Sequence, residues 1–307
     1  MLVMDLAVTA VRNLIYGALP ERRDDFAELW NRYLPAIEVV PDRAGVTMDA
    51  NKRRIQFDLK TLDAFWLIGF SAWHAIETYA PHVVIAMITQ TSVESVIRDD
   101  DELGLLEQDY KHRLRLAKTL LAGDDQGGVQ WPPDIPKPTD DRAALRNDQE
   151  RVAFDLTLLA TAYVFLHEFR HVMLDRDEQH PDSFPEEEIS CDVWARGMLL
   201  DKVAIYAEEH NHNYQEVLYK RAAAMAIACV ILQTITDEWA QWGTDEYPSV
   251  GERMAALIKD VALSADSGFW VVAASVLVGV MRETHQSLEL IPCSVPDLVN
   301  DLIERRR

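Results

Sequence analysis

An apolar, helix-forming segment with His-Glu-Phe-Arg-His inside it constrains this chain more than any other feature. The segment DLTLLATAYVFLHEFRHVML has the composition of a buried helix. In an α-helix, residues four apart share one face, so His167 and His171 can bind one divalent ion while Glu168 projects beside it. Two imidazoles and a carboxylate are costly to bury without a partner such as a metal. The sequence therefore predicts a metal-binding helix; the alternative is a core helix with two hydrogen-bonded histidines.

A catalytic zinc site needs a third protein ligand as well as an open coordination position. A metzincin-type site would have glycine three residues and a ligand six residues after the second histidine, where this chain has Leu174 and Asp177. Further along, Glu188 and Asp192 are four apart and share a helix face. We predict that Glu188 is the third zinc ligand and that Asp192 orients a ligating imidazole. His180 is the rival for the third ligand.

The helix that would carry these two carboxylates has clear start signals. Ser183 and Glu186 form an S-x-x-E capping box, and Pro185 lies in the first turn. Acidic side chains stabilise the first turn of any helix, and we interpret Glu186 and Glu187 in this way.

The proposed ligand set predicts hydrolysis of a peptide bond without a covalent intermediate. Glu168 would act as the general base, taking a proton from the attacking water and delivering it to the leaving amine. The expected cofactor is Zn²⁺, which would polarise the carbonyl group. The alternative from another functional class is a zinc-stabilised binding module in which Glu168 turns over no substrate.

The predicted fold class is α+β and mostly helical. Three short stretches rich in β-branched residues, 36–40, 46–49 and 54–59, predict a small N-terminal antiparallel sheet. We expect a zincin fold of the Glu-ligand, or gluzincin-like, type. An exposed strand edge in such a fold would bind an extended peptide substrate.

A segment rich in Pro, Gly and Asp, residues 123–147, predicts an irregular connection. It would divide the chain into an N-terminal α/β lobe, residues 1–122, and a lobe that is almost all helix, residues 148–307.

The charge balance and the cysteines restrict the partners and the compartment. Thirty basic and 51 acidic side chains give a net charge of −21, which repels nucleic acids and anionic lipids. Three separated cysteines without a CxxC pair fit a reducing compartment. The N-terminal segment lacks the basic region of a secretory signal, and the apolar runs at 65–76 and 269–281 are interrupted or too short to cross a bilayer. We expect a cytoplasmic protein with no membrane span and no nucleic-acid partner; its oligomeric state stays open.

Four segments resemble the Lit-type phage-exclusion peptidases, a family of bacterial HExxH zinc enzymes. They are WPPDIPKP at 131–138, HEFRH at 167–171, EEEISCD at 186–192 and YPSVGER at 247–253. The resemblance covers roughly residues 35–260. It implies a cytoplasmic phage-defence protease of narrow specificity that stays inactive until a phage component appears and then cleaves elongation factor Tu.

One position departs from the pattern expected of that family. Where a histidine is expected before the proline and the downstream arginine, this chain has Tyr247. A tyrosine can donate a hydrogen bond to an oxyanion as histidine does, and the alternative is a packing residue. The same zinc site would also suit an intracellular regulatory peptidase that clips a repressor or an antitoxin.

Overall fold

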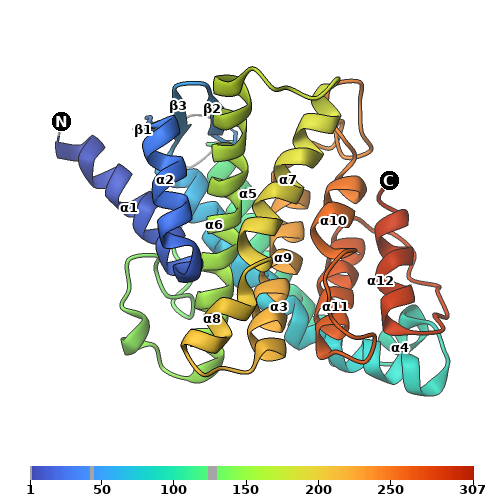
Figure 1. Cartoon of the computed structure of the whole chain (residues 1–307). Helices are drawn as coiled ribbons and strands as arrows, with labels where there is room; N and C mark the ends of the chain where they lie inside the picture. Colours follow the sequence, from blue (N-terminus) through green and yellow to red (C-terminus); the bar gives the residue numbers. More distant parts are fainter. Residues whose placement is uncertain (1, 42–44, 124–129) are drawn as a thin grey trace.

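The computed structural model describes residues 2–41, 45–123 and 130–307. Helices dominate it, and three short strands form its one described sheet (Figure 1). The helices are α1 (Leu2–Ala18), α2 (Arg23–Tyr33), α3 (Leu59–Thr89), α4 (Val93–Arg98), α5 (Leu103–Ala122), α6 (Asp148–Asp177), α7 (Phe184–Leu200), α8 (Val203–Glu209), α9 (Tyr214–Ile235), α10 (Val250–Ile258), α11 (Gly268–Glu283) and α12 (Val295–Glu304), with 3₁₀ turns at Pro20–Arg22 and Arg142–Ala144. The predicted mostly helical α+β class is confirmed.

The sheet has the strand order β1-β3-β2. β2 (Met48–Asn51) and β3 (Arg54–Phe57) form an antiparallel pair, whereas β1 (Ala36–Val39) pairs with β3 in parallel. The prediction of an antiparallel sheet is therefore wrong for β1. Each strand runs opposite to the one before it in the chain, so β1 and β3 run in the same direction. Because β1 pairs with the free edge of β3 instead of with β2, this pair is parallel. β2 is left as an edge strand of this sheet.

Helix α6 passes through the centre of the molecule and packs against α7, α9, α3, α1 and β2 (Figure 1). Phe169, in the middle of the His-Glu-Phe-Arg-His sequence, is fully buried and lies against α2, where its ring stacks on Trp30 at 5.8 Å and meets Phe26 at 5.2 Å. Burying such a side chain contributes roughly 1.5–3 kcal/mol. Because residues two apart point to nearly opposite sides of a helix, this packing turns His167 and His171 away from α2.

One continuous hydrophobic cluster contains residues from both sides of the predicted connection, including Phe65 on α3 and Phe165 on α6. The division into lobes at residues 1–122 and 148–307 stays a prediction. Within the predicted connection, residues 124–129 lie outside the described residues. The described part of it includes Trp131, whose indole N–H donates to the carbonyl of Ile135 at 2.7 Å.

Two of the described helices, α6 and α9, are long and apolar enough to cross a membrane by length and composition alone. In each of them, 78% of the most apolar window is buried inside the protein. Helices that are buried to this extent are typical of a protein core.

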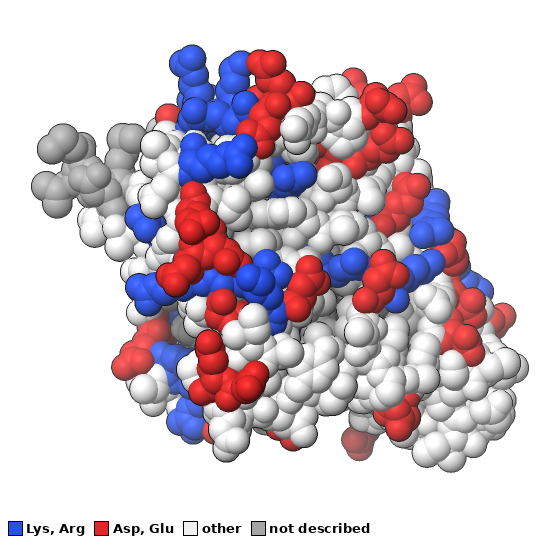
Figure 2. Space-filling view, in the orientation of Figure 1, with Lys and Arg blue, Asp and Glu red and all other residues white. Residues whose placement is uncertain are grey.

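Charged side chains of both signs are interspersed on the face of the molecule seen in Figure 2, between uncharged areas. The net charge of −21 is therefore not gathered into one unbroken acidic surface on this face.

Candidate metal centre

A short turn between α6 and α7 brings the candidate residues together. α6 ends where Glu178 adopts the left-handed conformation (φ 53°), and α7 begins after Ser183, whose side chain accepts a hydrogen bond from the backbone N–H of Glu186. The predicted start of this helix is confirmed. The two helices then pack side by side, so the start of α7 faces the histidines of α6.

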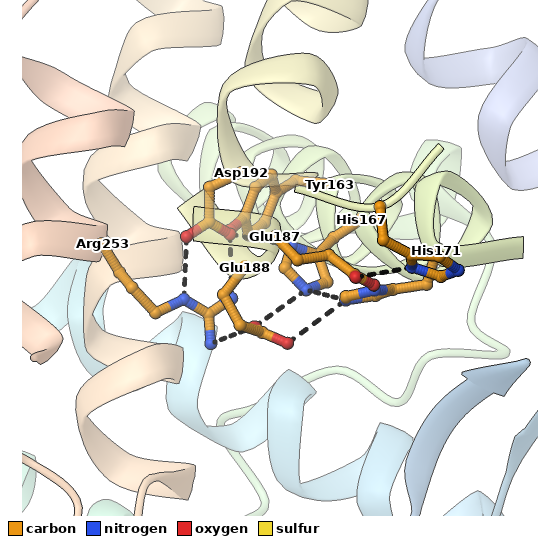
Figure 3. A network of polar contacts seen from close by, with 8 residues as sticks. Tyr163, His167, His171, Glu187, Glu188, Asp192 and Arg253 are labelled. Carbon is orange, nitrogen blue, oxygen red and sulfur yellow. Dashed lines mark hydrogen bonds and ion pairs between the residues drawn. The ribbon is translucent and has the colours of Figure 1, made fainter. Parts of the chain in front are cut away.

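Three side chains converge on one point (Figure 3). The Nε2 atoms of His167 and His171 are 3.1 Å apart. The Nε2 atom of His167 lies 3.3 Å from Oε2 of Glu188, and that of His171 lies 3.3 Å from the other oxygen, Oε1. These residues form the group of described side chains that could hold a metal.

A second set of carboxylates lies behind the histidines. His171 donates from Nδ1 to Glu187 at 2.7 Å, which leaves its Nε2 facing Glu188. The Nδ1 atom of His167 lies 2.8 Å from Asp192, as an ion pair whose alignment falls short of a hydrogen bond. Asp192 thus lies where it was predicted to lie, beside a candidate ligand. Our interpretation of Glu187 as a helix-dipole residue misses this contact with His171.

Arg253, on α10, anchors the buried Asp192. Its Nε and Nη2 atoms each donate to Asp192 at 2.8 Å, and its Nη1 atom lies 3.3 Å from Glu188. Tyr163 also donates its hydroxyl to Asp192, which is fully buried and needs such partners. Sequence reasoning quoted Arg253 within a motif without giving it a role, and it passed over Tyr163. The position of Tyr163, one helical turn before His167, was a usable signal.

These contacts shift the ionisation of the site. Burial alone would lower the pKa of His167, but Asp192 and then Glu188 outweigh it and raise this pKa to about 10. Burial opposes ionisation of Glu188 as well, yet the two histidines and Arg253 hold its pKa well below the ordinary value. Burial raises the pKa of Glu168 to about 7, against the influence of the histidines. Such a carboxylate can both accept and return a proton near neutral pH.

The site opens into a cavity of about 500 Å³. Glu168 and the three candidate ligands line it, together with residues of β2 and with Tyr247. Tyr247 is 46% exposed, and its ring meets the edge of Trp239 at 6.2 Å. The structure thus brings Tyr247 to the same cavity as the triad.

His180 lies outside the triad. Its Nδ1 atom donates to Glu187 at 2.8 Å, and its Nε2 atom lies 3.4 Å from Asp175. Both ring nitrogens therefore face carboxylates, and the side chain is 44% exposed. In this arrangement His180 and His171 both donate to Glu187.

A family model described as Peptidase U49 matches residues 55–273, a span that includes α6, the start of α7 and Arg253. The chain belongs to the peptidase U49 family. This membership confirms the resemblance to the Lit-type family and makes the chain a peptidase, a class of hydrolase. This U49 peptidase is 24% identical over 261 residues to the cell death peptidase of Escherichia coli (strain K12). The aligned residues make up 80% of this chain and 77% of that protein. No solved structure matches the chain.

Proposed function

We propose that this U49 peptidase is a zinc-dependent endopeptidase with a gluzincin-type site. The observation that supports it is the convergence of His167, His171 and Glu188, 3.1–3.3 Å apart, in the wall of a cavity that Glu168 also lines. These three residues would hold the ion, which would supply a Lewis acid for the scissile carbonyl.

The proton transfers fall to Glu168. Its carboxylate lines the same cavity as the three candidate ligands, where it would take a proton from the attacking water and then deliver it to the leaving amine. We assign to Tyr247, which lines the same cavity, a hydrogen bond to the oxyanion that forms on the substrate.

The substrate is a protein segment in extended conformation. β2 is an edge strand, and its residues Met48, Asp49 and Ala50 line the cavity. An extended peptide can add to such an edge through main-chain hydrogen bonds, which holds its carbonyl groups in a fixed register.

The biological role that we propose is a cytoplasmic phage-exclusion protease of narrow specificity. The name of the Escherichia coli relative, cell death peptidase, supports a suicidal host response. From the resemblance to the Lit-type peptidases we propose that the target is a host protein such as elongation factor Tu and that a phage-derived activator starts the cleavage. The same site would also serve a regulatory peptidase that clips a repressor or an antitoxin.

Two measurements on the same variants test the proposal. Metal analysis should find one zinc per chain in the wild type and in Glu168→Gln, and a large loss of zinc in Glu188→Ala. Detection of new protein N-termini in bacteria should reveal a product with the wild type that is missing with Glu168→Gln, while Glu186→Gln, at an exposed neighbouring site, keeps it. A wild type free of zinc would refute the metal site. Bound zinc without any cleavage product would favour the zinc-stabilised binding module.

A further inference from the structure

The C-terminal end of α3 presents an apolar stripe to solvent. Val84, Ile85 and Ile88 are 40%, 46% and 77% exposed, and Pro81 is exposed as well. Positions 81, 84, 85 and 88 have the spacing of a single helix face. The sequence has no Asp, Glu, Lys or Arg at positions 78–93, so the stripe carries no formal charge. Single exposed apolar residues are ordinary, whereas contiguous exposed apolar surface marks an interaction site.

An acidic turn lies beside this stripe. His82 follows Pro81, and its Nε2 atom lies 2.8 Å from Oδ2 of Asp100, in the turn between α4 and α5. The other carboxylate oxygen of Asp100 accepts hydrogen bonds from the backbone N–H groups of Glu102 and Leu103 at 2.9 and 3.2 Å. These contacts hold the turn against α3, at the flank of the stripe.

Three carboxylates of this turn have no cationic partner. Asp99, Asp101 and Glu102 are exposed, and none of them forms an ion pair with another residue of the described chain. Arg98, at the end of α4, lies 3.6 Å from Glu289 and is engaged there. A partner that covers the stripe therefore meets uncompensated negative charge along one side. Lysine and arginine side chains are attracted to such a rim, whereas acidic ones are repelled.

We propose that the stripe and the acidic turn together form a docking surface for a basic amphipathic helix of a protein partner. A helix face with this spacing can accept a second helix, because side-chain ridges of one helix pack into grooves of the other. Basic side chains beside the apolar face of the partner helix would then meet the three carboxylates. No residue of this docking surface lines the metal cavity, so a bound helix leaves that cavity open. The α3 docking surface consists of Pro81, Val84, Ile85, Ile88, Asp99, Asp101 and Glu102.

Fluorescence anisotropy with a fluorescein-labelled peptide tests the α3 docking surface. The peptide is built from leucine and lysine, is about four helical turns long, and has its leucines on one face. We expect it to bind the wild type and to bind the double variant Ile85→Gln/Ile88→Gln about tenfold more weakly, because the apolar anchors are lost. A peptide of the same composition with leucines scattered around the helix should also bind about tenfold more weakly. A version with glutamate in place of lysine should not bind.

Matched variants separate this surface from the general charge of the protein. Leu6→Gln replaces another exposed leucine, 64% exposed on α1, and should leave the affinity unchanged. Asp101→Asn/Glu102→Gln should weaken binding severalfold and reduce its dependence on salt. Glu208→Gln/Glu209→Gln, which removes two exposed carboxylates of α8, should do neither. Each of these side chains is exposed, so the melting temperature should be the same in all four variants.

Equal affinity for Ile85→Gln/Ile88→Gln and for Leu6→Gln would overturn the docking surface, because the net charge of −21 would then explain binding by itself. A wild type that binds none of the peptides would overturn it too. An equal loss in the two carboxylate variants would refute the basic side of the partner. Sedimentation velocity of the wild type gives the remaining outcome: a dimer that Ile88→Gln dissociates would make the stripe a contact between two copies of this chain and would refute the basic partner.

Discussion

Replacing Arg253 by methionine tests the network that holds the candidate metal centre in place. The substitution removes two hydrogen bonds of 2.8 Å from the fully buried Asp192. Loss of one partner from a buried ion pair costs about 3–5 kcal/mol. We expect the lower end, about 3 kcal/mol of unfolding free energy, because the hydroxyl of Tyr163 and the imidazole of His167 still face Asp192.

Urea unfolding of the metal-free protein at pH 8, followed by circular dichroism, measures this loss. The matched control is Arg142→Met, which removes a bidentate arginine from Asp155 at 2.5 and 2.8 Å in a pair whose arginine is 51% exposed. Exposed pairs contribute about 0–1 kcal/mol. If Arg253→Met costs no more than Arg142→Met, the buried network is not what stabilises this region.

The pH dependence of that difference has a defined sign. Burial alone would raise the pKa of Asp192, and Arg253 lowers it to about 2. In the wild type the stability from this group is therefore present above about pH 4 and lost as the pH falls through about 2. Without Arg253, Asp192 loses the largest of the influences that lower its pKa, while His167 still lowers it. The difference in unfolding free energy between the two proteins should narrow as the pH falls from about 4 towards 2; a constant difference would contradict the assignment.

Three more perturbations have expected outcomes. Glu187→Gln should lower zinc affinity by about tenfold, because His171 loses the carboxylate on its Nδ1 atom, whereas Glu186→Gln should leave the affinity unchanged. Competition with a fluorescent chelator measures both variants, and equal affinities would contradict the orienting role of Glu187. Zinc binding should weaken as the pH falls, because protons compete for two histidines whose pKa values are raised in the metal-free protein. Calorimetry at pH 7 in buffers of different ionisation enthalpy should then detect protons released when the ion binds, and release of none would refute this. Gly251→Ala should destabilise the fold by about 1–3 kcal/mol, because a Cβ atom there would meet the backbone of Arg306, and an unchanged melting temperature would show that this backbone can retreat.

The features that the sequence predicted are those that depend on local geometry. His167 and His171 lie on one face because they are four residues apart, and α7 begins at Ser183 because that side chain caps it. Glu188 faces these two histidines because the short turn between α6 and α7 restricts where α7 can pack. The roles of these residues in catalysis stay predictions.

The features that the sequence did not predict depend on contacts between distant segments. Arg253 reaches Asp192 across 61 positions of the chain, and no periodicity encodes that contact. The contact between Glu187 and His171 was missed because Glu187 was assigned to the helix dipole, and this contact depends on the rotation of α7 about its axis. The pairing of β1 with β3 is likewise a choice between two strand edges, and alternating hydrophobicity is the same for both.

The hairpin of α6 and α7 has a consequence for how such a peptidase can change. Residues 167–188 carry the proposed metal ligands and the proposed general base in one continuous stretch, whereas β2 and residues 235–240 supply surfaces that face a substrate. Mutations in the second group can accumulate without disturbing the first. A lineage with this arrangement can acquire new targets through changes in one loop and one strand while its hydrolytic chemistry is inherited intact.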